Sequence, residues 1–345
     1  MRRLIAFLLA LLLAACGQPT PTAQESYVFG TRVEVLVWGA RGVAAQTAGD
    51  EVLREFDRLH RTYHAWQASE LTALNAAIAA GRPHEVSAEL ADLIVTAQAL
   101  TVQSEHLFDP GIGRLVALWG FHSDEFKPAL PAAAALAALV AAKPSITDLT
   151  VKDRIVTSKN PAVALDFGGY LKGVALDRAA AILKTRGIQN ALVNIGGNVL
   201  ALGKKGDKPW RVGIQHPRTA QSGGTPLATL ELHDGEAIGT SGDYQRYFEL
   251  DGRRYSHLID PRTGMPVVGT QALTVLIPAA KDAGLRSDVL SKPLFVAGAD
   301  WLALARKTGA GQALRVDGEG RVAVTAALRQ RLTFEPANLD VSVVP

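Results

Sequence analysis

A tight hairpin centred on Asp251-Gly252 constrains the fold of this chain more than any other sequence feature. Both central residues of a type I′ turn have positive φ, and Asp-Gly is one of the few dipeptides that adopt this turn readily. The turn predicts antiparallel pairing of residues 245–250 with residues 253–257. We expect this pairing to bring hydroxyls, an imidazole and carboxylates to one end of a sheet: Thr240, Ser241, Asp243, His257 and Asp260.

The polar residues around this hairpin have two interpretations. Residues 241–243 and 260–264 are ordinary turn sequences, in which the side chains bond to their own backbone and serve no further role. The alternative is a site in which donors, acceptors and a titratable imidazole converge. The hairpin alone does not decide between these two interpretations.

The remaining chain alternates between helical and extended patterns. Helices are expected over residues 45–61, 88–104, 131–142, 171–186 and 300–307. Strands are expected over residues 27–37, 155–157, 163–166, 191–195, 210–215, 228–232 and 273–277. The sequence has no internal repeat and no glycine loop of the P-loop or Rossmann type. This pattern predicts a mixed α+β fold without a regular βαβ array.

The first residues have the layout of a secretory signal. Arg2 and Arg3 precede an apolar run over residues 4–15 that is too short to span a bilayer. Cys16 is the single cysteine and ends a Leu-Ala-Ala-Cys sequence that resembles a bacterial lipobox. An ordinary signal peptide with an incidental Cys16 is the alternative. We expect a lipoprotein signal peptide, a lipid-anchored tether and a folded domain over residues 1–15, 16–26 and 27–345.

Lipidation of Cys16 would anchor the protein to the cell membrane, facing the periplasm. Gly17 favours the outer over the inner membrane under the usual sorting rule. With one cysteine, the domain has no internal disulfide and must be held by its core. The formal net charge of +3 includes Arg2 and Arg3, so the mature chain is nearly neutral. This charge gives no support for nucleic-acid binding.

Five blocks, in order along the chain, resemble signatures of the ApbE family, the FAD:protein FMN transferases. The fifth block contains Thr-Ser-Gly-Asp-Tyr and Ser-His-Leu-Ile-Asp-Pro-Arg-Thr-Gly, around the hairpin described above. The others include Phe-Gly-Thr, Ser-Glu-Leu-Thr-Ala-Leu-Asn, Phe-Asp-Pro and Asp-Phe-Gly-Gly-Tyr-Leu-Lys-Gly. The blocks occupy residues 29–31, 69–75, 108–121, 166–177 with 194–198, and 240–264.

This resemblance implies a large mixed or antiparallel sheet with packed helices and a lobe, and FAD bound in the cleft between them. It implies an enzyme that moves FMN from FAD to a Thr or Ser hydroxyl of a partner protein and releases AMP. The implied partners are membrane-bound or periplasmic redox subunits. Two alternatives need the same pocket: an FAD pyrophosphatase of the same fold, and a periplasmic FAD-binding lipoprotein without catalysis.

The resemblance also assigns FAD contacts. Lys172 follows a glycine-rich turn and precedes a helix, which suits phosphate binding. Tyr63 and Trp66 both qualify as the aromatic residue at the flavin, and core packing is the alternative role of Phe29 and Phe108. The implied contacts are Phe29, Tyr63, Trp66, Leu107, Phe108, Asp109, Asp166, Lys172, Asn198, Thr240, Ser241, Leu258 and Ile259.

His257 is the expected acceptor of the hydroxyl proton, or a group that orders the pyrophosphate; a satisfied strand-end histidine is the alternative. Asp260 would orient its imidazole or hold the water shell of a metal. The resemblance implies Mg²⁺ at Gly169, Asp288, Ser291 and Lys292. Lys292 departs from the threonine of the family pattern, and an ammonium has no lone pair with which to ligate a metal. Its charge is therefore expected to weaken dependence on Mg²⁺.

Overall fold

The computed structural model describes residues 20–123, 125–219, 224–335 and 339–345. Within those ranges the largest sheet has nine strands, in the order β1-β2-β6-β7-β10-β13-β14-β15-β17. Neighbouring strands are antiparallel, except that β15 and β17 are parallel. The strands are β1 (Thr22–Val28), β2 (Thr31–Val37), β6 (Ala191–Ile195), β7 (Asn198–Leu202), β10 (Ala237–Gly242), β13 (Thr270–Ile277), β14 (Ala313–Asp317), β15 (Val322–Thr325) and β17 (Val341–Val344).

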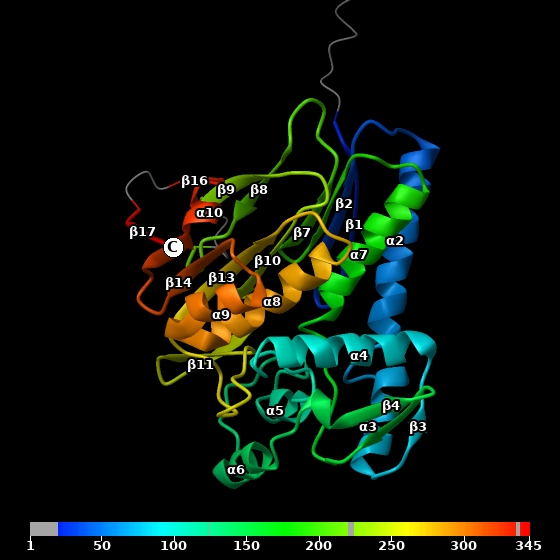
Figure 1. Ribbon diagram of the computed structural model, residues 1–345, viewed down its shortest axis with the longest axis vertical. Coiled ribbons are helices and arrows are strands. Elements are labelled where there is room, and N and C mark those ends of the chain that lie inside the picture. The colour runs from blue at the N-terminus through cyan, green and yellow to red at the C-terminus, as the bar shows by residue number, and fades with distance from the viewer. Residues whose placement is uncertain (1–19, 124, 220–223, 336–338) are drawn as a thin grey trace, which may run out of the picture.

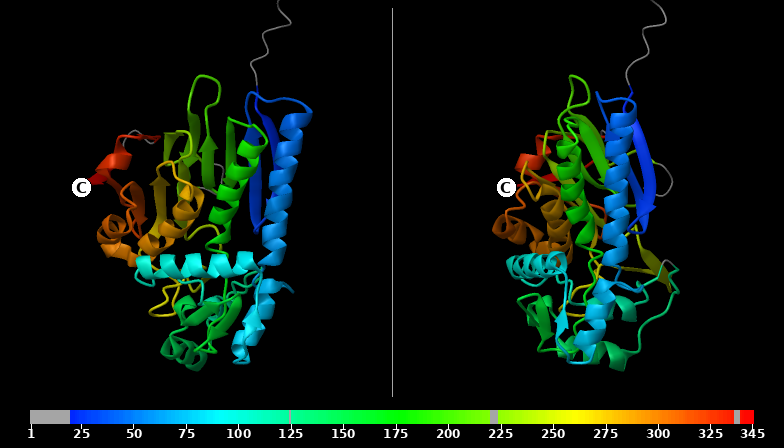
Figure 2. Two further views of the ribbon diagram at one scale, coloured as in Figure 1. Left: turned by 45° about the vertical axis from the view of Figure 1, so that its right-hand side comes forward. Right: turned by 90° about the vertical axis from the view of Figure 1, so that its right-hand side faces the viewer.

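Successive side chains of a strand point to opposite faces. Since every residue of β7 and β13 is buried, the middle of this sheet is covered on both faces. In β6, Val193 and Ile195 belong to a core beneath the helices, whereas Leu192 belongs to a second core on the other side. Four helices lie side by side over the first face (Figure 1, Figure 2). They are α2 (Val43–Thr62), α7 (Leu171–Thr185), α8 (Ala283–Ala297) and α9 (Trp301–Thr308).

The second face packs against a small antiparallel sheet of order β16-β9-β8. Trp210 is almost fully buried there, and its indole Nε1 donates to the carbonyl of Leu202 at 3.0 Å. These elements complete a mixed α+β architecture, as the sequence pattern predicts. They are β8 (Trp210–Ile214), β9 (Ala228–Leu232) and β16 (Leu332–Phe334), with the short helix α10 (Ala326–Arg329).

A lobe lies at one end of the main sheet, at the bottom of Figure 1. Ser87 caps one of its helices by accepting a hydrogen bond from the amide of Leu90, as predicted. None of the side chains of α6 is buried, in agreement with a surface helix. The lobe contains α3 (Glu70–Ala79), β3 (His84–Glu85), α4 (Ala88–Gln103), α5 (Gly113–Leu118), α6 (Ala133–Ala142), the 3₁₀ turn η1 (Ile146–Asp148), β4 (Leu149–Lys152) and β5 (Ile155–Ser158). Outside the lobe, a second 3₁₀ turn, η3 (Gly298–Asp300), joins α8 to α9.

The predicted hairpin joins the sheet to this lobe. Strand β11 (Tyr247–Leu250) pairs with β12 (Arg253–Ser256), and the turn residues Asp251 and Gly252 have φ of 50° and 71°. Trp119 of the lobe donates from its indole nitrogen to the carbonyl of Gly264 at 2.7 Å and stacks on an aromatic ring of the hairpin. The loops on either side of the hairpin are therefore held against the lobe.

Three local predictions were wrong. Residues 27–37 form no single strand, because Phe29 and Gly30 adopt positive φ and turn the chain between β1 and β2. Since β1 begins at Thr22, residues 22–26 belong to the sheet and not to a tether. Residues 163–166 form no strand and make only a single bridge between Ala164 and Ile112.

Residues 1–19, and with them the expected signal and Cys16, lie outside the described part of the chain. Among the residues that are described, no helix combines the length and the apolar character that crossing a membrane requires.

Candidate functional site

A cavity of about 1260 Å³ lies where the main sheet, the lobe and the hairpin meet. It is lined by the turn between β1 and β2, the end of α2, the start of α7, strand β10 and the segment after β12. Most residues expected at the site line it: Phe29, Tyr63, Trp66, Leu107, Phe108, Asp109, Asp166, Gly169, Lys172, Thr240, Ser241, His257, Leu258, Ile259 and Lys292. Gly196 and Gly197 also reach it, at positive φ of 58° and 94°.

Asn198, Asp288 and Ser291 lie directly behind the cavity wall. Asp288 is only 1% exposed, and its Oδ2 accepts the backbone N–H of Gly173 at 2.8 Å. Its Oδ1 accepts hydrogen bonds from the side-chain amide of Asn198 at 2.9 Å and from the ammonium of Lys292 at 2.6 Å. Ser291 Oγ donates to the carbonyl of Asp288 at 2.9 Å and lies 2.8 Å from Ser241 Oγ. This wall is a closed hydrogen-bonded network.

The four residues expected to hold Mg²⁺ do not fit a divalent cation. Mg²⁺ requires near-octahedral oxygen ligands, whereas both carboxylate oxygens of Asp288 already accept hydrogen bonds. The ammonium of Lys292 brings its own positive charge to Oδ1, and its stem packs on Gly169. Across the described ranges, no group of three or more His, Cys, Asp or Glu side chains is arranged to bind a metal. In this geometry the partner of Asp288 Oδ1 at the expected metal position is the ammonium of Lys292.

His257 is held in one tautomer by the backbone of the neighbouring strand. Its Nδ1 lies 3.1 Å from the carbonyl oxygen of Arg246. A carbonyl only accepts hydrogen bonds, so Nδ1 carries the proton and Nε2 is left as an acceptor. Burial, followed by the charge of Arg246, lowers the pKa of His257 to about 3, with smaller contributions from Lys172 and Lys292. His257 is consequently neutral at physiological pH.

Asp260 does not orient this imidazole, contrary to one of its two expected roles. Its carboxylate accepts hydrogen bonds from the guanidinium of Arg262 at 2.8 Å and from the backbone N–H of Arg262 at 2.9 Å. It does not belong to the cavity lining. The residue instead fixes the turn that follows the hairpin, and the Arg246 carbonyl has the orienting role.

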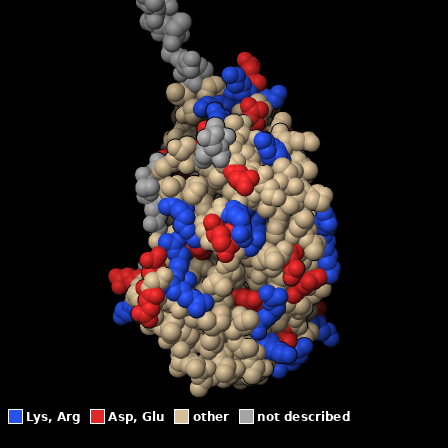
Figure 3. Space-filling view, turned by 90° about the vertical axis from the view of Figure 1, so that its left-hand side faces the viewer, with Lys and Arg blue, Asp and Glu red and all other residues tan. Residues whose placement is uncertain are grey.

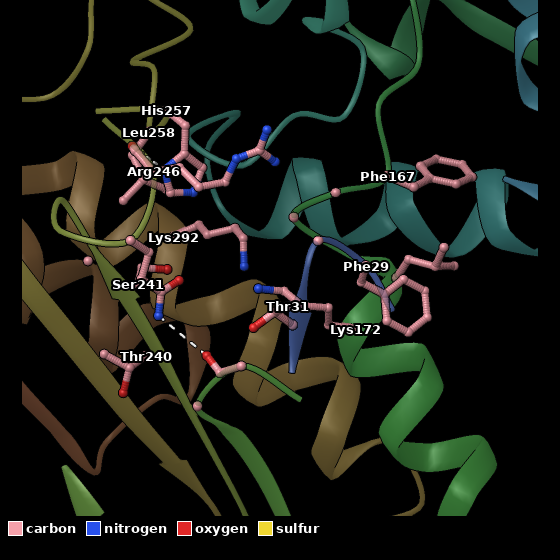
Figure 4. A pocket seen from close by; sticks show the side chains of 18 of the residues that line it. Phe29, Thr31, Phe167, Lys172, Thr240, Ser241, Arg246, His257, Leu258 and Lys292 are labelled. Carbon is pink, nitrogen blue, oxygen red and sulfur yellow. Dashed lines mark hydrogen bonds between the residues drawn. The ribbon is translucent and has the colours of Figure 1, made fainter. Parts of the chain in front are cut away.

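Among the Lys and Arg side chains that line the cavity, Lys172, Arg246 and Lys292 lie close enough to His257 for their charges to lower its pKa. The ammonium ends of Lys172 and Lys292 point toward one another (Figure 4). Burial lowers the pKa of Lys172; the charges of Lys292 and Arg246 lower it further, whereas Asp288 opposes the shift. Cations brought together in this way favour an anionic ligand.

Arg246 is a site residue that the sequence analysis missed. Its guanidinium donates to the carbonyl oxygens of Phe121 at 3.1 Å and Ser123 at 3.2 Å, and so bridges the hairpin to the lobe. The pairing register of the hairpin could have identified Arg246 from the sequence. A turn centred on Asp251-Gly252 pairs Tyr247 with Ser256 and therefore places Arg246 opposite His257.

The aromatic residues differ in what they offer a flavin. Tyr63 is 2% exposed and its hydroxyl donates to Glu89 Oε2 at 2.9 Å, whereas Trp66 is half-buried beside His122. Trp66 thus presents more of its ring to the cavity. Phe29 packs on Phe56 and His60, and Phe108 stacks on Tyr170. Both therefore also contribute to the core.

Two of the expected carboxylates stabilise turns in the lining. Asp109 Oδ1 accepts the backbone N–H groups of Gly111 at 2.8 Å and Ile146 at 2.9 Å. Asp166 Oδ1 accepts that of Gly168 at 2.8 Å. Burial raises the pKa of both carboxyls, and the hydrogen bonds oppose this shift. Leu107, Phe108 and Asp109 line the cavity and are buried.

Acidic and basic side chains are interspersed over the face of the molecule seen in Figure 3. In the lining of the cavity, five Lys and Arg side chains stand against three Asp and Glu side chains.

Comparisons with known proteins agree with this geometry. The family model described as "ApbE family" matches residues 29–314. An FAD:protein FMN transferase of Rhodobacter capsulatus is 43% identical over 316 residues, which cover 91% of this chain and 59% of that relative. This chain thus spans about three fifths of the length of that relative.

Two solved structures have the same fold. The crystal structure of the ApbE protein of Thermotoga maritima has a TM-score of 0.80 at 29% identity and covers 90% of this chain and 99% of its own. The crystal structure of the apo form of the flavinyl transferase ApbE of Pseudomonas stutzeri has a TM-score of 0.77 at 30% identity. It covers 92% of this chain and 98% of its own. The family match extends over most of the chain and includes all the residues that line the cavity except Tyr27 and Val28. This protein belongs to the ApbE family.

Proposed function

We propose that this protein transfers the FMN part of FAD to a threonine or serine hydroxyl of a partner protein. The hydroxyl oxygen forms a bond to the phosphorus on the FMN side, and the bond from that phosphorus to the bridging oxygen breaks. AMP leaves with the bridging oxygen, and the hydroxyl proton passes to a base. The printed names of the relatives, FAD:protein FMN transferase and flavinyl transferase, support this reaction.

The observation that carries the proposal is a neutral imidazole beside a cationic cavity. Because His257 Nδ1–H is directed to the Arg246 carbonyl, Nε2 has the lone pair needed to accept the hydroxyl proton. A base with its orientation fixed in this way needs no rearrangement before it acts. His257 is therefore the proposed proton acceptor.

The cations complete the site. A pyrophosphate diester resists attack by an oxygen nucleophile until its negative charge is offset. Lys172, Lys292 and Arg246 provide that charge at the end of the cavity where His257 lies. Thr240 and Ser241 of β10 provide hydroxyls in the same wall. In this proposal no step passes through Mg²⁺, because the described residues do not fit it.

The sequence supports a proposal for the location of the protein. We infer that Cys16 is lipidated after removal of residues 1–15, and that the domain is anchored to the cell membrane on the periplasmic side. The acceptor is then a membrane or periplasmic redox subunit with an accessible threonine or serine. Transfer to such a partner requires only that the hydroxyl enter the cavity beside His257.

The test is incubation of the purified protein with FAD and threonine-bearing redox subunits, followed by mass spectrometry of each subunit. Transfer predicts an adduct of FMN mass on one threonine or serine. Release of free FMN and AMP with no adduct would identify a pyrophosphatase, and recovery of intact bound FAD would identify a carrier. Either result would reject the proposed function.

A further inference from the structure

The position at which the family pattern implies a metal is occupied in this chain by an ammonium group. Lys292 Nζ lies 2.6 Å from Asp288 Oδ1 and 2.7 Å from the Asp288 carbonyl oxygen. These bonds use two of the three donors of the ammonium. The side chain is 16% exposed, and Lys292 lines the cavity, so the third donor is available to a ligand.

Packing keeps the ammonium in this place. A Cβ atom on Gly169 would lie 2.8 Å from Lys292 Cε, so the absence of a side chain at residue 169 leaves room for the lysine stem. Lys292 is four residues after Asp288 on α8, where the two side chains are neighbours on one face of the helix. The ion pair is therefore built into α8 and is not a chance contact of a mobile lysine.

The local charges are unbalanced. Lys172 and Lys292 direct their ammonium ends toward one another (Figure 4), and Asp288 is the carboxylate that they share. Lys292 pairs with Asp288 directly, whereas Lys172 has neither an ion pair nor a hydrogen bond within the described ranges. The gap between the two lysines thus attracts an anion, and lysine is a competent phosphate ligand as a point charge.

We propose that Lys292 is the built-in cation of this site and that, with Lys172, it binds the pyrophosphate of FAD without a divalent metal. This inference rests on the proposed function, since it takes FAD as the ligand. It assigns the role expected of Mg²⁺ to a residue of this chain. The protein then needs Lys292 at the position where the family pattern implies a metal.

The test measures the dissociation constant of FAD by flavin fluorescence, with a chelator and with saturating Mg²⁺. Wild-type protein is expected to bind FAD equally well in both. Lys292→Thr is expected to bind about tenfold to a hundredfold more weakly with chelator, as a charge-assisted hydrogen bond is lost, and to recover with Mg²⁺. Riboflavin lacks the pyrophosphate, so wild-type protein and Lys292→Thr should bind riboflavin with the same affinity in both conditions.

Two further variants keep the test decisive. Lys172→Met leaves the Asp288 pair intact and should weaken FAD binding with or without Mg²⁺. Lys307→Thr makes the same substitution at an ion-paired lysine of α9 outside the cavity lining. This variant should bind FAD as wild-type protein does, both with chelator and with Mg²⁺. The melting temperature of each variant identifies any loss of folding.

The outcomes separate the inference from the function on which it rests. Wild-type protein that binds FAD only when Mg²⁺ is present would overturn the role of Lys292 and leave the transferase proposal standing. Wild-type protein that binds no FAD in either condition would overturn both. The comparison on wild-type protein decides the matter even if Lys292→Thr fails to fold.

Discussion

The Nδ1 atom of His257 lies 3.1 Å from the backbone carbonyl oxygen of Arg246, on the opposite strand of the hairpin. The same carbonyl accepts the backbone N–H of His257 at 3.0 Å. A two-residue turn at Asp251-Gly252 therefore determines which nitrogen of the imidazole faces the cavity. It also brings the Arg246 charge close enough to suppress protonation of that imidazole.

Replacement of the imidazole should slow transfer without preventing FAD binding. Loss of a general base typically lowers a rate by about 10²–10⁴-fold. We expect His257→Ala to show a decrease of this order in kcat, with the dissociation constant of FAD little changed. His84→Ala on β3, outside the cavity lining, is the matched control. Equal rates for His257→Ala and wild type at saturating FAD would exclude the role.

The pH dependence of transfer follows from the charges around His257. Burial, followed by Arg246, lowers its pKa to about 3 in the free protein, and the nearby lysines contribute. Bound pyrophosphate offsets these cations and therefore raises the pKa of His257 in the FAD complex. Protonated His257 accepts no proton, so the rate falls as pH decreases through the pKa.

The acidic limb of kcat should accordingly lie at higher pH than the acidic limb of kcat/KM, since kcat/KM reports the free protein. Measurement of both parameters across the acidic range checks this order. An acidic limb of kcat/KM centred at the ordinary histidine value of 6.5 would show that the imidazole is not shielded from protonation.

The close approach of α7 and α8 depends on Gly173. A Cβ atom there would lie 2.7 Å from the Gly284 carbonyl oxygen and 2.7 Å from Leu285 Cα, and these backbone atoms have no freedom to move aside. We expect Gly173→Ala to lower the free energy of unfolding by about 1–3 kcal/mol, measured in urea. Gly311→Ala is the control, because its new Cβ would meet no atom within 4 Å. Equal losses in the two variants would refute the steric explanation.

The sequence predicted the features that depend on local patterns. The Asp251-Gly252 turn and the Ser87 cap both depend on short-range chemistry, whereas the site residues around the hairpin were assigned through the family resemblance. Helix α8 was not predicted, because eleven of its fifteen residues are buried and Pro293 interrupts its pattern, so no polar face marks it. The turn at Phe29 was missed since positive φ is rare for an aromatic residue.

In the site as well, local sequence patterns predicted some features, and the tertiary structure determined the others. Lys292 was recognised as a departure from the family pattern, but its two bonds to Asp288 follow from the helical geometry of α8, which the sequence pattern did not reveal. The role of Asp260 was misplaced because its position two residues before Arg262 gives it a nearer partner than His257. Competition between a local ion pair and a tertiary contact is decided by geometry.

The proposed lipid anchor depends on a single thiol. Cys16 is the only cysteine of the chain, so Cys16→Ser removes the sole acceptor for a thioether-linked lipid. We expect the variant to be released from membranes or to remain unprocessed, as judged by membrane fractionation and mass. Full retention in the membrane fraction at the wild-type size would argue for a different means of attachment.

Parallel measurement of AMP and of the FMN adduct on an acceptor protein tests the central claim, that FAD is cleaved by a protein hydroxyl. The account predicts one AMP released for each FMN attached, and loss of both products when the acceptor threonine or serine is replaced by alanine. AMP that forms at the same rate without an acceptor hydroxyl, together with free FMN, would contradict the account and show that water is the nucleophile.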